Sequence, residues 1–168
     1  RVAREEVPHA NTNEEMIENE GRGWLILTAD QVVTQTQTQT LDSENGTRIL
    51  EKPSSVAQAK QFVSSYAVHA PRTVGSCVLT HIPSLIQISG FDTARINFKP
   101  TIHGDLVDKL IQDGAPVLKC AGGLMVEHTF VREYIEGIDG TEDSVMGLSK
   151  ELVWRLLTKM KSKLAELE

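Results

Sequence analysis

An isolated acid at the end of an apolar segment is the first residue of this sequence that could do chemistry. Residues 24–29 read Trp-Leu-Ile-Leu-Thr-Ala, and Asp30 and Gln31 follow before two valines resume the apolar run. A run of this type predicts a strand that is buried on both faces. A carboxylate at the end of such a strand needs a partner, a metal or a task, so Asp30 is a candidate functional residue.

Two further groups of residues could act with this acid. The chain offers a cation at Lys52, and Pro53 holds that residue in an extended conformation. Later, Gly122 and Gly123 precede a predicted short apolar strand that ends on Glu127. Glycines at such a point allow a backbone or a ligand to approach closely.

Each of these residues also has a purely structural interpretation. Asp30 could form a turn or an ion pair, and Lys52 could be a solvated surface lysine. Glu127 could pair with Lys119 or with Arg132, which lie nearby in the sequence. Residue types alone leave both interpretations open.

Length and composition limit the possible classes of protein. A chain of 168 residues with 40% hydrophobic content can bury a core and is most simply one domain. A formal net charge of -6 argues against a general nucleic-acid binder or a binder of anionic membranes. Two cysteines, Cys77 and Cys120, are too few for a disulfide framework and predict a reducing, cytoplasmic compartment.

Other features restrict metal content and targeting. The five histidines show no ligand spacing with one another or with the cysteines, so no zinc site is expected. No segment has the length of a transmembrane span, and the first residues do not form a signal peptide. Since the chain opens on Arg1 and not on methionine, we expect its true N-terminus to lie upstream.

Hydrophobic periodicity predicts an irregular alternation of strands and helices. Ser55 and Gln58 fit a capping box before a helix whose apolar stripe ends at Tyr66. This pattern predicts a three-layer α/β domain with a mixed, partly antiparallel sheet. Strands are expected at residues 48–50, 72–80, 85–90 and 91–99, and helices at 54–66, 102–113 and from Ser149 onward.

The strand at 91–99 has the clearest alternation. Ala94, Ile96 and Phe98 point to one face, and the polar residues between them point to the other. An antiparallel strand with one wet face is therefore expected.

Two polar stretches are expected to lie outside the regular elements. The Thr/Gln repeat at 34–40 has no apolar face, which predicts an exposed arm or a disordered loop. The strand at 48–50 should then pair near Val32 and Val33, with the repeat bulging out. Residues 135–144 read as an acidic, turn-rich loop.

Four short motifs together resemble the successive signatures of the Maf family of nucleoside triphosphate pyrophosphatases. They stand in the family's order and span most of the chain: Ala-Asp-Gln-Val-Val at 29–33, Glu-Lys-Pro at 51–53, Ala-Gly-Gly-Leu-Met-Val-Glu at 121–127 and Asp-Ser-Val-Met-Gly-Leu at 143–148.

The resemblance implies an ITPase-like fold and a hydrolase that cuts between the α- and β-phosphates, giving a monophosphate and pyrophosphate. It also implies a divalent metal, Mg or Mn, and a homodimer. Asp30 falls on the family's proposed general base and would also ligate the metal, and Lys52 falls on a lysine that contacts the phosphates. A carboxylate beside a triphosphate can ligate a metal or orient the attacking water.

Two positions resemble one branch of the family, the 7-methyl-GTP pyrophosphatases, because Gln31 follows the acid and Glu127 ends the Ala-Gly segment. The branch that acts on dTTP and UTP carries Thr and Gln there. A carboxylate suits the adjacent N–H donors of guanine and the cationic methylated ring. Gln31 could instead only satisfy backbone groups. Gly122, Gly123 and Ser144 lie in family signatures and are expected to bind substrate.

Two departures from the family pattern leave alternatives open. The family's N-terminal strand and arginine-containing phosphate-binding turn have no match, so residues 1–168 are expected to form a single Maf-like domain without them. The acid and the lysine are also further apart than in most relatives, which fits a surface insertion. The alternatives to 7-methyl-GTP hydrolysis are hydrolysis of dTTP or UTP, and a catalytically inactive nucleotide-binding protein.

Overall fold

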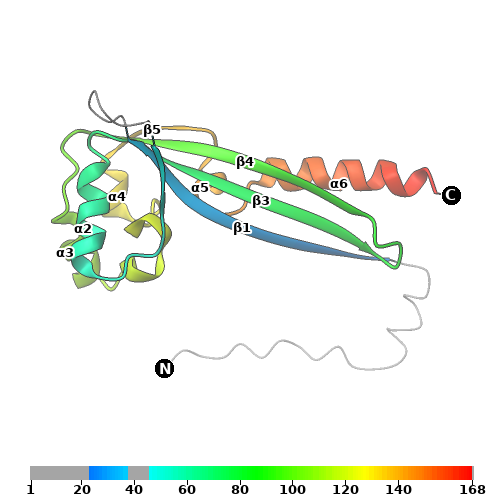
Figure 1. Ribbon diagram of the computed structural model, residues 1–168, viewed down its shortest axis with the longest axis horizontal. Coiled ribbons are helices and arrows are strands. Elements are labelled where there is room, and N and C mark those ends of the chain that lie inside the picture. Colours follow the sequence, from blue (N-terminus) through cyan, green and yellow to red (C-terminus); the bar gives the residue numbers. More distant parts are fainter. Residues whose placement is uncertain (1–22, 38–45, 168) are drawn as a thin grey trace.

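The computed structural model describes residues 23–37 and 46–167, which form one five-stranded sheet with helices packed against it (Figure 1). The strand order is β2-β1-β3-β4-β5. The strands are β1 (Trp24–Gln37), β2 (Gly46–Leu50), β3 (Pro71–Ile82), β4 (Gln87–Phe98) and β5 (Ile135–Asp139). The helical elements are α2 (Val56–Ser65), α3 (Leu106–Gln112), η1 (Val117–Lys119), η2 (Ala121–Gly123), α4 (Thr129–Arg132), α5 (Glu142–Val145) and α6 (Lys150–Ala165).

The predicted α/β class is confirmed, whereas the predicted mixed sheet is not found. Every strand pairing among the described residues is antiparallel. The register of β1 with β3 and of β3 with β4 runs without interruption. Each side chain on these three strands can therefore be assigned to a face by simple alternation.

The helices of the described residues lie on one face of this sheet, so the predicted third layer is not among them. Val33, Thr73 and Ala94 face the larger core, which includes α2 and α3. Cys77 has the same parity as Thr73 and packs under Leu152 of α6. Figure 1 shows α2, α3 and α4 at one end of the long strands and α6 along their other half. We call this side the covered face.

The prediction that β1 is buried on both faces is wrong. Trp24 is 66% exposed, and Ile26 and Leu27 are also exposed. Trp24 and Ile26 alternate with Leu27, so they lie on the face opposite the covered face, where no described helix packs. β2 also contacts β1 only from Val33 to Gln37, so no described strand borders the outer edge of β1 before Val33. Hydrophobicity indicated an apolar segment but could not show which of its faces a helix covers.

The prediction that nothing in the Thr/Gln repeat is buried is also wrong. β2 pairs with β1 as expected at Val33, but β1 continues through the first part of the repeat to Gln37. Gln35 is only 1% exposed, and its Nε2 donates hydrogen bonds to Ser65 Oγ at 2.9 Å and to His69 O at 2.6 Å. Burial is tolerated because these two partners satisfy the amide. The rest of the repeat lies outside the described residues.

Local capping signals were predicted correctly. The Ser55 side chain accepts a hydrogen bond from Gln58 N at 3.2 Å, and the Gln58 side chain accepts one from Ser54 N at 2.7 Å. Ser149, where the last helix was expected to start, caps α6 by accepting a single hydrogen bond from Leu152 N. Such capping bonds satisfy the orphan N–H groups of a helix start.

Three segment assignments need correction. Residues 121–123 form the 3-10 helix η2 and residues 124–127 are irregular, so no strand forms there; Gly122 and Gly123 both have positive φ, which a strand does not allow. Residues 135–139, expected as loop, form β5, which pairs with β4. The two strands expected at 85–90 and 91–99 are one strand, because pairing with β3 continues through Gly90. None of the described helices is long and apolar enough to cross a membrane.

Candidate active site

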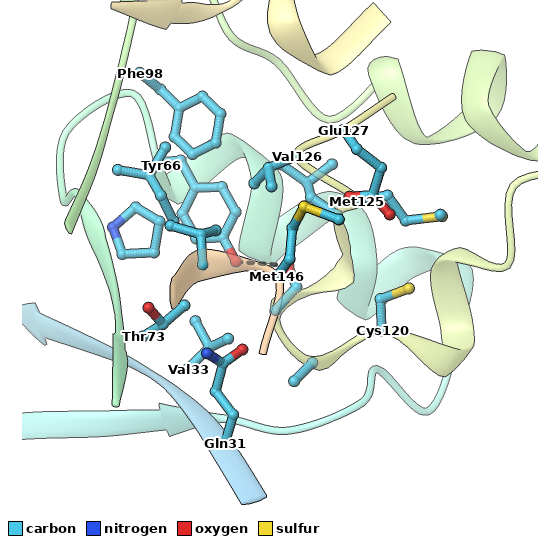
Figure 2. A pocket seen from close by; sticks show the side chains of 16 residues that line it. Gln31, Val33, Tyr66, Thr73, Phe98, Cys120, Met125, Val126, Glu127 and Met146 are labelled. Atoms are coloured by element: carbon cyan, nitrogen blue, oxygen red, sulfur yellow. Dashed lines mark hydrogen bonds between the residues drawn. The ribbon is translucent and has the colours of Figure 1, made fainter. Parts of the chain in front are cut away.

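A cavity of about 240 Å³ lies between the covered face of the sheet and the turns that follow α3 (Figure 2). Its sheet side is mostly apolar, with Val33 from β1 and Ile96 and Phe98 from β4, and two polar residues, Gln31 and Thr73, also line it. α5 contributes Val145 and Met146. A concave, mostly apolar space with a few polar groups is the usual form of a small-molecule site.

Gln31 is brought into this cavity from β1. It lies two residues before Val33, so strand alternation puts both side chains on the covered face. Figure 2 shows the amide pointing from the strand into the pocket. Its Nε2 donates a hydrogen bond of 2.6 Å to Ser144 O, which anchors the side chain at one end of the cavity.

The two predicted glycines form a turn in the cavity wall, and only Gly122 lines it. Gly122 has φ 72° and Gly123 has φ 74°, in the left-handed region that favours glycine. Tyr66 Oη donates a hydrogen bond of 2.5 Å to Gly122 O. Burial raises the pKa of Tyr66 well above its usual range, so the phenol stays protonated as this donor. Gly123 is buried beside Ala59.

Glu127 and Cys120 line the cavity, and the charge of Lys52 acts on the Cys120 thiol. Burial raises the pKa of Cys120, the carboxylate of Glu127 raises it further and the ammonium of Lys52 lowers it. Both charges therefore act on the same part of the wall. Glu127 lines the cavity, Lys52 does not, and both side chains are exposed.

Ser144 is placed behind the cavity on α5, where it is only 3% exposed. Its carbonyl holds Gln31, and its hydroxyl donates a hydrogen bond of 2.5 Å to Asp92 Oδ2. Its backbone N–H donates to the Thr141 hydroxyl, which caps the short helix. Ser144 is not among the residues that line the cavity, but its carbonyl and its hydroxyl each hold a neighbouring side chain.

Asp30 is the predicted residue that the structure separates from the others. It is the neighbour of Gln31 on β1, so alternation puts its side chain on the opposite face of the sheet. Its carboxylate is exposed and accepts one hydrogen bond, from Gln31 N at 2.8 Å.

The part of the chain that the structure describes contains no preformed cluster of side chains that could bind a divalent metal. No group of three or more histidine, cysteine, aspartate or glutamate side chains comes together there. Asp30 offers one exposed carboxylate with oxygen lone pairs to spare. A single carboxylate fits Mg²⁺ when substrate phosphates and waters supply the remaining ligands.

Two residues of this site were not identified from the sequence. Tyr66 was expected only as part of the apolar stripe of a helix. Its hydroxyl group, which needs a hydrogen-bond partner when buried, could have indicated the contact with the glycine turn. Asp92 has the same parity as Ala94, so a carboxylate on the apolar face of the strand at 91–99 was visible in the alternation.

The antiparallel sheet with its helices defines an α/β protein, and its candidate site is the cavity lined by the glycine turn, Gln31 and Glu127. A family model described as Maf-like protein matches residues 2–160, and the chain belongs to the Maf family. The chain is 31% identical over 136 residues to the 7-methyl-GTP pyrophosphatase of Dictyostelium discoideum. That match covers 81% of this chain but 62% of the relative, so the chain spans less than two thirds of its length. The resemblance seen in the four motifs is confirmed.

Proposed function

We propose that this protein hydrolyses 7-methyl-GTP to the monophosphate and pyrophosphate. The observation that carries the proposal is the polar lining of the cavity, where Gln31 and the Glu127 carboxylate are set among apolar walls. The name of the Dictyostelium relative supports the same reaction.

Glu127 would read the base. Guanine presents N1–H and an exocyclic amine side by side, and a carboxylate accepts hydrogen bonds from both. Methylation at N7 makes the ring cationic, which strengthens its attraction to a carboxylate. Val33 and Phe98 would bury the faces of the base, as apolar walls do in most ligand sites.

Lys52 and Asp30 would act at the phosphates. The Lys52 ammonium would offset negative charge near the mouth of the cavity, and Asp30 would orient the attacking water and accept its proton. A bound Mg²⁺ or Mn²⁺, with Asp30 as its protein ligand, would supply Lewis-acid stabilisation of the phosphate charge. Because Asp30 and Gln31 lie on opposite faces, the triphosphate would cross the outer edge of β1, where β2 has not yet begun to pair.

The test is pyrophosphate release by the full-length protein from 7-methyl-GTP, GTP, dTTP and UTP with Mg²⁺ or Mn²⁺. Preferred cleavage of 7-methyl-GTP would support the proposal, and Glu127→Gln should then shift preference toward the pyrimidine nucleotides. Preferred cleavage of dTTP or UTP would keep the enzyme class and refute the assignment of the base. Binding of nucleotides without cleavage would favour the inactive nucleotide-binding alternative. The homodimer and the cytoplasmic location remain predictions from the sequence.

A further inference from the structure

A row of three residues crosses the covered face of the sheet beside the cavity. Gln31 on β1 is opposite Gly75 on β3, and Gly75 is opposite Asp92 on β4. Residues directly opposite on antiparallel strands share a face. The row therefore carries an amide at one end, a carboxylate at the other and no side chain between them.

Ser144 bridges the two ends of this row. Gln31 Nε2 donates to Ser144 O at 2.6 Å, and Ser144 Oγ donates to Asp92 Oδ2 at 2.5 Å. A Cβ atom on Gly75 would lie 3.7 Å from Gln31 Nε2, an ordinary van der Waals distance, so the amide lies directly above this glycine. Ser144 is 3% exposed, so its carbonyl and hydroxyl are largely shielded from water, while Gln31 and Asp92 are partly exposed.

The bridge decides which atom of the Gln31 amide faces the cavity. A carbonyl oxygen only accepts hydrogen bonds, so the amide must turn its nitrogen toward Ser144 O. Its Oε1 is then directed elsewhere, and no described residue donates to it. No buried side-chain polar atom of the described residues lacks a partner, so Oε1, which has none, is not buried. The Gln31 side chain lines the cavity, and we therefore place Oε1 toward a ligand there.

We propose that Asp92 is a positioning residue that, through Ser144, holds the Gln31 amide with its oxygen toward the ligand and so sets a preference for bases that present N–H donors. This inference rests on the proposed nucleotide-binding function of the cavity. An amide oxygen accepts from the N–H groups of guanine but faces repulsion from the carbonyl oxygens of uracil.

Asp92 is the sheet residue that can fix the position of Ser144. α5 has only four residues, and its capping bonds to Thr141 and Lys150 fix its ends along the chain. The Ser144 hydroxyl bond is the described side-chain hydrogen bond that joins α5 to β4. Without Asp92, the carbonyl of Ser144 loses its fixed position above the row, and the amide becomes free to turn its nitrogen to the ligand.

The experiment compares the affinities of the full-length protein and its variants for 7-methyl-GTP and UTP by calorimetry, without added metal. Asp92→Ala should lower the ratio of the two affinities by about tenfold, the value of one well-placed hydrogen bond. Ser144→Ala should lower it similarly. Asp92→Asn keeps an acceptor for the serine hydroxyl and should retain the ratio. Asp139→Ala is the matched control, because it removes a β5 carboxylate that bonds Asn97 outside this row.

A second measurement needs no ligand. The Gln31 side-chain NH₂ protons should exchange slowly with solvent in the wild-type protein and in Asp92→Asn, and faster in Asp92→Ala and Ser144→Ala. Equal weakening of both nucleotides in Asp92→Ala, with unchanged exchange at Gln31, would assign Asp92 a structural role and overturn the inference. A wild-type protein that binds neither nucleotide refutes the proposed function and the claimed base preference together. Exchange at Gln31 would then still report whether Asp92 orients the amide.

Discussion

Replacing Gly122 by alanine should lower the free energy of unfolding by roughly 2–5 kcal/mol. Its φ of 72° lies in the left-handed region, which costs a residue with a Cβ atom roughly 1–2 kcal/mol. The added Cβ would also lie 2.8 Å from Tyr66 Oη and 3.2 Å from a Val33 methyl group. Displacing the phenol would weaken its bond to Gly122 O, which adds roughly 1–3 kcal/mol for a buried acceptor left unsatisfied.

The chain provides a matched control for the two parts of this estimate. Gly114 has φ 83°, but a Cβ there would meet nothing within 4 Å. Gly114→Ala should therefore show only the backbone cost of roughly 1–2 kcal/mol. The measurement is urea unfolding of both variants, and in a Tyr66→Phe background the cost of Gly122→Ala should fall toward that of Gly114→Ala. If the two alanine variants differ by less than about 0.5 kcal/mol, the close approach of Tyr66 does not constrain this turn.

Three further predictions concern other parts of the site and fold. Asp30→Asn should abolish pyrophosphate release and leave the urea midpoint unchanged, and retained turnover would remove Asp30 from the mechanism. Gln35→Ala should cost roughly 1–3 kcal/mol in urea unfolding, because it removes two part-buried hydrogen bonds, to Ser65 and to the His69 carbonyl; a loss below about 0.5 kcal/mol would contradict this. Hydrogen bonds from Lys150 N and the Thr141 hydroxyl hold the pKa of Asp143 below its ordinary 3.8. Its contribution to stability should be complete above that pH and lost as the pH falls through the lowered pKa. Asp143→Asn should therefore unfold with a weaker dependence on pH below about 4 than the wild-type protein, and identical acid profiles would refute the assignment.

Features with a local cause were predictable from the sequence. The cap at Ser55 depends on residues within one helical turn, and the same holds for Ser149 at the start of α6. The alternation around Ile96 depends only on the period of a strand. These signals need no knowledge of what packs against them.

Features that depend on distant partners were not predictable. The burial of Gln35 is possible because Ser65 and His69, more than one element away, provide its partners. Trp24 is exposed because it lies on the face that no described helix covers, which the hydrophobicity of the segment does not encode. The Gln31 side chain is held by the backbone carbonyl of Ser144. Because every residue has a backbone carbonyl, the residue type at position 144 could not predict this contact.

The separation of Asp30 from the cavity follows from the shortest possible spacing in a strand. Adjacent residues of a strand point to opposite faces of the sheet, so the Asp30 and Gln31 side chains lie on opposite faces of the edge strand β1. Under the proposed function, one substrate reaches both only by crossing β1 where its outer edge has no described partner strand. β2 first pairs at Val33, two residues beyond Gln31, and this start leaves the crossing open. Extending β2 pairing to Asp30 would close the edge with backbone hydrogen bonds and separate the base from the hydrolytic carboxylate. The register of β1 with β2 is therefore as much a condition of the proposed chemistry as either side chain.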